Sequence, residues 1–166
     1  GGRRKARRPR VAAGVTRRYK AGMSLDPQTT DSPTARGVGD LVGWFRTRER
    51  PPSEWKVGLE HEKVGLAAGT LEPAPYDGPG GIAALLRGFE RFRYAPVEDG
   101  GHVIAAQKEG LTVSIEPGGQ LELSGRPFQD VHAVAAELDR HLAKCRALDD
   151  ELGIELLAVG YRPWGT

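Results

Sequence analysis

The sequence predicts an α+β fold, in which an antiparallel sheet carries helices on one face. Three segments repeat apolar residues at helical spacing, and short segments that alternate apolar and polar residues lie between them. Glycine and proline account for 35 of the 166 residues, about 21% against an average of about 12%, which indicates many turns. The length is that of one ordinary domain.

The first half of the chain is predicted to contain a helix, a strand, a loop and a second helix. The first helix is indicated by apolar residues at positions i, i+3, i+4 and i+7, namely Val38, Leu41, Val42 and Phe45. Pro51-Pro52 ends it. A strand follows over Trp55–Leu66, and the glycine- and proline-rich residues Ala68–Gly81 form a loop. The same apolar spacing predicts a second helix over Gly81–Phe92.

The second half is predicted to form short strands, the longest helix and a final strand. The short strands are Tyr94–Val97, His102–Lys108, Leu111–Glu116 and Gln120–Leu123, with hairpin turns at Glu109-Gly110 and Pro117-Gly118-Gly119. The longest helix begins at about Pro127 and ends at Leu152, with Gly153 just past its end. Its apolar stripe consists of Val131, Val134, Ala135, Leu138, Leu142, Cys145, Leu148 and Leu152. The final strand is Ile154–Gly160.

Charge is distributed unevenly along the chain. Residues 1–22 hold nine basic and no acidic residues, whereas residues 23–166 hold fifteen basic and twenty-two acidic residues, a net charge of −7. We expect residues 1–22 to be a disordered leader or a misassigned start, with Met23 as the natural first residue. The alternative is an arm that binds nucleic acid through phosphate contacts, although the acidic remainder disfavours that partner.

Other sequence features exclude several classes of protein. No apolar run approaches the roughly 20 residues that cross a bilayer, and no apolar stretch of a secretory signal follows the basic start. The single Cys145, which the apolar stripe places in the core, excludes an internal disulfide framework and a cysteine-rich zinc site. We therefore expect a cytoplasmic protein without a membrane partner.

Three predicted strands each have an apolar face and an acidic face. Because side chains alternate across a strand, Glu60 and Glu62 share one face of the first strand. A three-residue turn at 117–119 would place Glu116 opposite Gln120, and Ser114 opposite Glu122. If the first strand joins the same sheet, four carboxylates gather on one polar surface, together with Gln120 and Ser124.

Such a cluster is expected to need a cation or raised pKa values. Two carboxylates about 6 Å apart repel by about 3 kcal/mol at an effective dielectric constant near 20. Hard oxygen ligands suit Mg²⁺ or Ca²⁺ rather than zinc, and Mg²⁺ commonly shares its shell with substrate phosphates. The functional interpretation is a metal–nucleotide site. The structural alternative is a set of solvated glutamates on the wet face of an antiparallel sheet.

The chain resembles the glutamate–cysteine ligase family of the plant and proteobacterial class. The similarity lies in four segments, taken in order: KVGLEHEK (56–63), PYDG (75–78), EPGGQLELSG (116–125) and ELGI (151–154) with Gly160. It covers nearly all of residues 23–166, which we expect to be the N-terminal part of a glutamine-synthetase-like catalytic domain. Family members are far longer than this chain, so we expect an incomplete fragment that is inactive alone.

The resemblance implies an ATP-dependent ligase that acts in the first step of glutathione biosynthesis. ATP would phosphorylate the side-chain carboxylate of L-glutamate, and the amine of L-cysteine would then attack the acyl phosphate. The family's metal ligands correspond to Glu60, Glu62, Glu116 and Glu122, which would hold Mg²⁺, with Mn²⁺ as a substitute. Substrate or ATP binding is assigned to Gln120, Ser124 and Lys63. The alternatives are another carboxylate–amine ligase of the superfamily and a non-catalytic binding protein with a basic arm.

Overall fold

The computed structural model describes residues 34–162, and its contacts divide the chain into two units, residues 1–48 and 49–166. In the first unit, α1 (Val38–Arg46) confirms the predicted helix. The Arg48 guanidinium lies 3.8 Å from the centre of the Trp44 ring and donates to the Trp44 carbonyl, just past the end of this helix. The predicted leader at 1–22 and the proposed start at Met23 lie outside the described residues.

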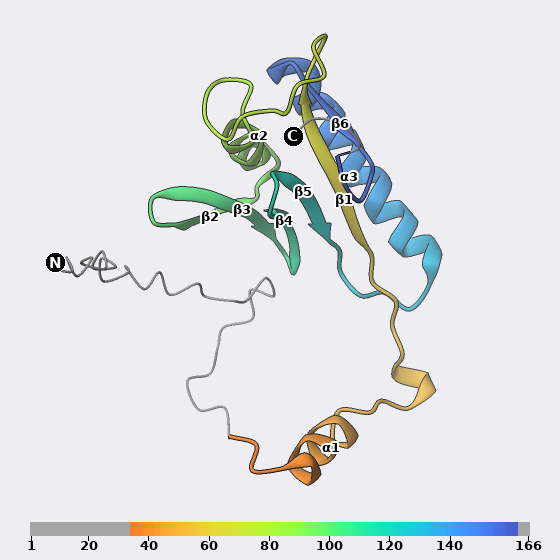
Figure 1. Cartoon of the computed structure of the whole chain (residues 1–166). Coiled ribbons are helices and arrows are strands. Elements are labelled where there is room, and N and C mark those ends of the chain that lie inside the picture. Colours follow the sequence, from red (N-terminus) through yellow and green to blue (C-terminus); the bar gives the residue numbers. More distant parts are fainter. Residues whose placement is uncertain (1–33, 163–166) are drawn as a thin grey trace, which may run out of the picture. The chain divides into compact units, whose positions relative to one another are not determined.

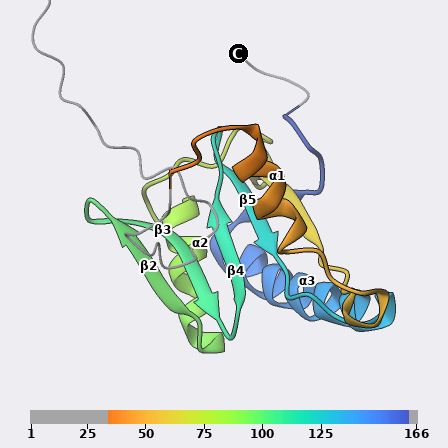
Figure 2. The same ribbon diagram turned by 90° about the horizontal axis from the view of Figure 1, so that it is seen from below.

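The second unit is built on one six-stranded antiparallel sheet in the order β2-β3-β4-β5-β1-β6. The strands are β1 (Glu60–Ala67), β2 (Ala95–Asp99), β3 (His102–Lys108), β4 (Leu111–Ile115), β5 (Gln120–Ser124) and β6 (Ile154–Leu157). Helices α2 (Ile82–Gly88) and α3 (Val131–Leu152) cover one face of this sheet (Figure 1 and Figure 2). Short 3-10 helices occupy Pro52–Glu54 and Phe89–Phe92. The predicted fold class is confirmed.

The hydrophobic core lies between the sheet and the two helices. Its buried side chains come from α2, the 3-10 helix Phe89–Phe92, α3 and strands β3 to β6, and include Leu85, Leu86, Phe89, Val113, Leu121, Leu123 and Leu148. Close approach of α2 and α3 depends on Gly88, since a Cβ atom there would lie 2.3 Å from Leu148 Cδ2. Cys145 is buried in this core, as the apolar stripe predicted, and burial raises the pKa of its thiol to about 12.

Local chemistry explains the turn and the helix end that the sequence predicted. Gly118 and Gly119 have φ angles of +85° and +81°, which glycine adopts without strain. The Glu116 N–H donates to the Gln120 carbonyl at 2.8 Å across this turn. Gly153 ends α3 in the left-handed region with φ +65°. Across residues 34–162, no helix combines the length and hydropathy that a membrane span requires.

Three predicted boundaries were wrong, each because residues at the end of the predicted element make other backbone contacts. Phe128 pairs with Val57 in an isolated bridge, so residues 127–130 lie outside the helix and α3 begins at Val131. The side chain of Asp130 caps α3 by accepting from His132 N and Ala133 N. The same bridge lies before β1, which begins at Glu60 rather than Trp55. The final strand ends at Leu157, since Val159 N turns back onto the Leu157 carbonyl.

The apolar stripe of α3 also differs from the prediction. Val131 and Ala135 are exposed, whereas Glu137 and His141 are buried, with exposed fractions of 4% and 0%. The buried face of α3 therefore contains two polar residues that the predicted stripe did not include. A spacing of four residues joins Glu137, His141 and Cys145 on one helix face, and this spacing is visible in the sequence.

Candidate functional site

The acidic surface lies on the sheet face opposite α2 and α3. Residues directly opposite one another in neighbouring antiparallel strands share a face. The registers of β1 with β5 and of β4 with β5 place Glu62 opposite Glu122, and Glu122 opposite Ser114. The flanking rows are Glu60–Ser124–Thr112 and Val64–Gln120–Glu116. The structure thus brings Glu60, Glu62, Glu116, Glu122, Gln120 and Ser124 onto one surface, and within the hairpin the pairing of Ser114 with Glu122 and of Glu116 with Gln120 is as predicted.

Two polar side chains orient carboxylates within this surface. Gln120 Nε2 donates to Glu62 Oε2 at 3.2 Å and to the Gly160 carbonyl at 3.0 Å. Ser124 Oγ donates to Glu122 Oε1 at 2.7 Å. The amide and the hydroxyl therefore fix one carboxylate on each of two neighbouring strands.

Glu116 is the most perturbed carboxyl group of this surface. Burial raises its pKa, and the carboxylates of Glu122, Glu62 and Glu60 raise it further. Its Oε1 atom is buried and has no hydrogen-bond partner. A carboxylate oxygen that lacks a donor, in the field of three other carboxylates, is a position that a cation would stabilise.

The carboxylate oxygens of this surface are suitable ligands for a hard cation. Their positions, however, do not surround an ion completely. All four acids offer oxygen ligands, as Mg²⁺ prefers. However, within residues 34–162 no three His, Cys, Asp or Glu side chains are placed so that they could hold a metal ion together. A cation bound here would need further oxygen ligands, such as phosphate oxygens or water.

A hollow opens beside this surface where β1 begins and β5 ends. It has a volume of about 280 Å³ and is lined by Gly58, Leu59, Glu60, Ser124 and Gly125. Gly58 has no neighbouring atom within 4 Å of the position that a Cβ atom would take. The hollow therefore gives a ligand access to one end of the acidic surface.

Lys63 is not brought together with the acidic residues. It pairs with the core residue Leu121, so its side chain lies on the helix face, where only 1% of Lys63 is exposed. Its Nζ atom lies 3.0 Å from both the Nδ1 atom and the carbonyl oxygen of His61. Burial lowers the pKa of Lys63. This placement does not support contact between Lys63 and a substrate on the acidic surface.

Comparison with known proteins shows the family to which the chain belongs. The sequence model of the glutamate-cysteine ligase family 2 (GCS2) matches residues 56–166. The chain is 41% identical over 128 residues to the chloroplastic glutamate–cysteine ligase of Solanum lycopersicum, covering 76% of this chain and 24% of that protein. It is 35% identical over 170 residues to glutamate–cysteine ligase A of Oryza sativa subsp. japonica, covering 98% of this chain and 34% of that protein.

These relatives agree with one expectation from the sequence, that family members are far longer than this chain, and contradict another, its location. This chain spans only about a quarter to a third of the length of these two relatives. The relatives are named chloroplastic, which contradicts the cytoplasmic location expected for this chain. The absence of a secretory signal and of a membrane-spanning run was therefore an insufficient basis for that location.

Proposed function

Because the chain belongs to glutamate–cysteine ligase family 2, we propose that it forms part of an enzyme that joins L-glutamate to L-cysteine with consumption of ATP. This is the first step of glutathione biosynthesis. The observation that carries the proposal is the cross-strand pairing of Glu62 with Glu122 on a surface that also holds Glu60 and Glu116. Residues 23–166 would form the N-terminal part of the catalytic domain.

The proposed reaction has two steps, and both need dense negative charge to be neutralised. The γ-phosphoryl group of ATP passes to the side-chain carboxylate of glutamate, and ADP leaves. The amine of cysteine then attacks the acyl carbon, and phosphate leaves as the amide forms. Bound Mg²⁺, or Mn²⁺ in its place, would neutralise phosphate charge during the transfer. The acidic surface supports this proposal. Its glutamates supply some of the oxygen ligands that such an ion needs, and the triphosphate of ATP would supply the others.

The other residues of the surface are proposed to position the carboxylates. Gln120 holds one oxygen of Glu62, and Ser124 holds one oxygen of Glu122, which leaves the remaining carboxylate oxygens free to face a cation. The hollow beside Glu60 is the proposed entry for a substrate. We leave Lys63 out of the substrate site, since its side chain is buried on the other face of the sheet.

The test needs a chain of full family length, because this chain covers only part of its relatives. We would replace the matching segment of the Solanum lycopersicum enzyme by this chain and measure γ-glutamylcysteine formation with Mg²⁺ and ATP. In the exchanged protein, Glu62→Gln is expected to lower the rate at least 100-fold, because one of the paired carboxylates is lost. The matched control is Glu72→Gln, an exposed glutamate in the loop after β1, which is expected to leave the rate unchanged.

A second measurement covers the case in which the exchanged protein fails to fold. Electron paramagnetic resonance of Mn²⁺ with ATP and the 166-residue chain should show a bound ion, and Glu62→Gln should weaken its binding, whereas Glu72→Gln should not. Full ligase activity of the Glu62→Gln protein would refute the assignment of the metal site. Glutamate-dependent ADP release with an amine other than cysteine would instead support the alternative carboxylate–amine ligase.

A further inference from the structure

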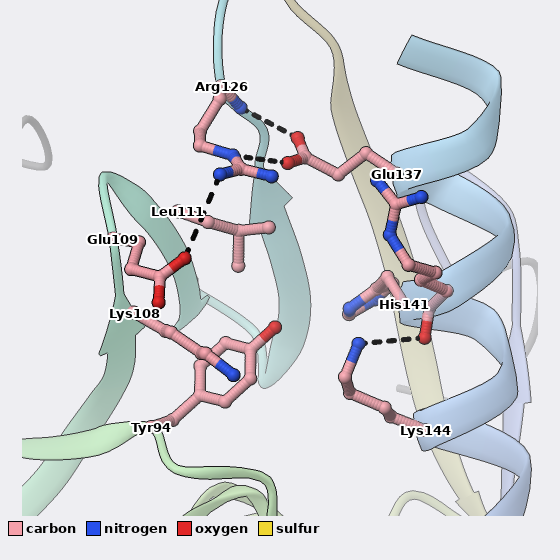
Figure 3. A pocket seen from close by; sticks show the side chains of 9 residues that line it. Tyr94, Lys108, Glu109, Leu111, Arg126, Glu137, His141 and Lys144 are labelled. Carbon is pink, nitrogen blue, oxygen red and sulfur yellow. Dashed lines mark hydrogen bonds and ion pairs between the residues drawn. The ribbon is translucent and has the colours of Figure 1, made fainter. Parts of the chain in front are cut away.

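A second cavity lies on the helix side of the sheet, on the face opposite the acidic surface. It has a volume of about 180 Å³ and lies between α3 and the turn that joins β3 to β4 (Figure 3). The side chains that line it include Tyr94, Lys108, Arg126, Glu137, His141 and Lys144. The aromatic ring of Tyr94 is part of this lining, and the proposed ligase reaction does not use any residue of the cavity.

The lining of this cavity has an excess of positive charge. It holds four cationic and two anionic side chains, a net charge of +2 when His141 is neutral. Both anionic side chains are already engaged by Arg126, which bonds Glu137 with Nε at 2.7 Å and with its backbone N at 2.8 Å, and lies 4.0 Å from Glu109. Within residues 34–162, Lys108, Arg140 and Lys144 therefore face the cavity without a carboxylate in an ion pair.

The two lysines converge on the same aromatic ring. Their Nζ atoms lie 5.8 Å (Lys108) and 6.0 Å (Lys144) from the centre of the Tyr94 ring. Each Nζ atom donates one hydrogen bond to a backbone carbonyl, Lys108 to Phe92 and Lys144 to Arg140, at 3.0 Å in both cases. An ammonium group carries three hydrogens, so two remain on each lysine for another acceptor. Burial, followed by the charges of Lys108 and Arg140, lowers the pKa of Lys144, as expected where negative charge is lacking.

His141 adds a buried ring nitrogen that has no hydrogen-bond partner. The side chain is completely buried, lines the cavity and stacks on Phe89, with ring centres 5.9 Å apart. Its Nε2 atom lies 3.3 Å from Cys145 Sγ, while its Nδ1 atom is buried and has no hydrogen-bond partner. The imidazole is neutral at pH 7 because burial lowers its pKa to about 3. We assign the Cys145 thiol as the donor to Nε2, which places the one ring hydrogen on Nδ1, where it lacks an acceptor.

We propose that this cavity binds a phosphate-sized oxyanion between Lys108, Lys144 and the Nδ1–H group of His141. The anion would accept hydrogen bonds from two ammonium groups and one imidazole, and would offset the excess positive charge. A volume of 180 Å³ is smaller than the 300–1,000 Å³ of typical drug-sized ligand sites, so the cavity suits a single phosphate group rather than a nucleotide. The inference does not depend on the proposed ligase function.

The test is a titration of the 166-residue chain with inorganic phosphate at constant ionic strength, set with sodium chloride. We expect a saturable shift of the His141 ring nitrogen signals in ¹⁵N nuclear magnetic resonance spectra, with Nδ1 as the protonated nitrogen. Lys144→Met is expected to weaken phosphate binding at least tenfold, because it removes one charge from the cavity. The matched control, Lys56→Met, changes an exposed lysine outside the cavity and is expected to bind phosphate as the unmodified chain does.

Two further measurements identify the source of the anion and test whether weaker binding results from misfolding. Glycerol 3-phosphate, titrated in the same way, separates a free phosphate ion from the end of a phosphate ester, and binding of either supports the proposal. His141→Phe keeps the stacking on Phe89 but removes the donor, so it is expected to bind phosphate at least threefold more weakly while the circular dichroism spectrum is retained. Two results would overturn the proposal, namely no saturable shift in the folded chain, or equal binding by the Lys144→Met and Lys56→Met variants.

Discussion

At the scale of single residues, the two faces of the sheet place opposite charges in separate environments. The acidic surface holds four glutamates, while the cavity on the helix side holds unpaired lysines. Both faces leave a buried polar atom without a partner, Glu116 Oε1 on one side and His141 Nδ1 on the other. Such atoms cost free energy when they have no partner, and a cation at Glu116 or an oxyanion at His141, as proposed above, would offset this cost.

The perturbed carboxyl of Glu116 predicts how stability depends on pH. Its pKa is raised in the folded chain by burial and by Glu122, Glu62 and Glu60, so the folded state binds its proton more tightly than the unfolded state does. Its contribution to stability is therefore most favourable below its unfolded pKa and is lost as pH rises through the raised value. Glu116→Gln should stabilise the chain at pH 7 by up to about 1 kcal/mol, the size of a cross-strand charge repulsion.

Urea denaturation of Glu116→Gln and of the unmodified chain at pH 7 and pH 4 checks this prediction. The stabilising effect should shrink at pH 4, because a larger share of the Glu116 carboxyl groups is protonated and uncharged there than at pH 7. Glu72→Gln, whose carboxyl lies outside the acidic surface, should leave the stability unchanged at both pH values. An equal effect of Glu116→Gln at both pH values would show that shape, rather than charge, causes the change.

At the scale of secondary-structure elements, local signals could be predicted from the sequence and distant contacts could not. The turn at 117–119 followed from its glycines, and the end of α3 followed from Gly153. The start of α3 was missed because the bridge between Val57 and Phe128 joins residues far apart in the sequence.

The candidate site shows the same division between local and distant information. The pairing of Glu122 with Ser114 within one hairpin was predicted from the turn alone. The pairing of Glu62 with Glu122 depends on β1 lying beside β5, which the sequence suggested only as a condition. The burial of Glu137 and His141 was missed because the predicted stripe was built from apolar residues and Cys145 alone, although the spacing of Glu137 and His141 matches that of Cys145.

The contact between α2 and α3 predicts a large effect from a small substitution. A Cβ atom at Gly88 would lie 2.3 Å from Leu148 Cδ2, and Leu148 is 1% exposed, so its side chain has little room to move. Gly88→Ala should therefore destabilise the chain by about 1–3 kcal/mol, as overpacked cores do. This exceeds the gain of up to about 1 kcal/mol that alanine brings to a helix.

A double-mutant cycle by urea denaturation tests whether Leu148 causes this effect. Leu148→Ala alone should cost about 2–5 kcal/mol, because it leaves a cavity in the core. The double variant should cost less than the two single variants together, since the smaller side chain makes room for the new methyl group. Strict additivity would locate the strain of Gly88→Ala elsewhere in the fold.

At the scale of the whole molecule, the division into two units predicts that the sheet-containing unit is stable by itself. The described core is formed by α2, α3 and strands of the sheet, all within residues 49–166, and no residue of α1 is buried. A chain of residues 49–166 should therefore unfold in one cooperative transition, with a free energy of unfolding within about 0.5 kcal/mol of that of the 166-residue chain. Urea denaturation followed by circular dichroism measures both values. A clearly lower stability of residues 49–166 would show that residues 1–48 contribute to the folded core. Experiments on the acidic surface would then need a chain that includes residues 1–48.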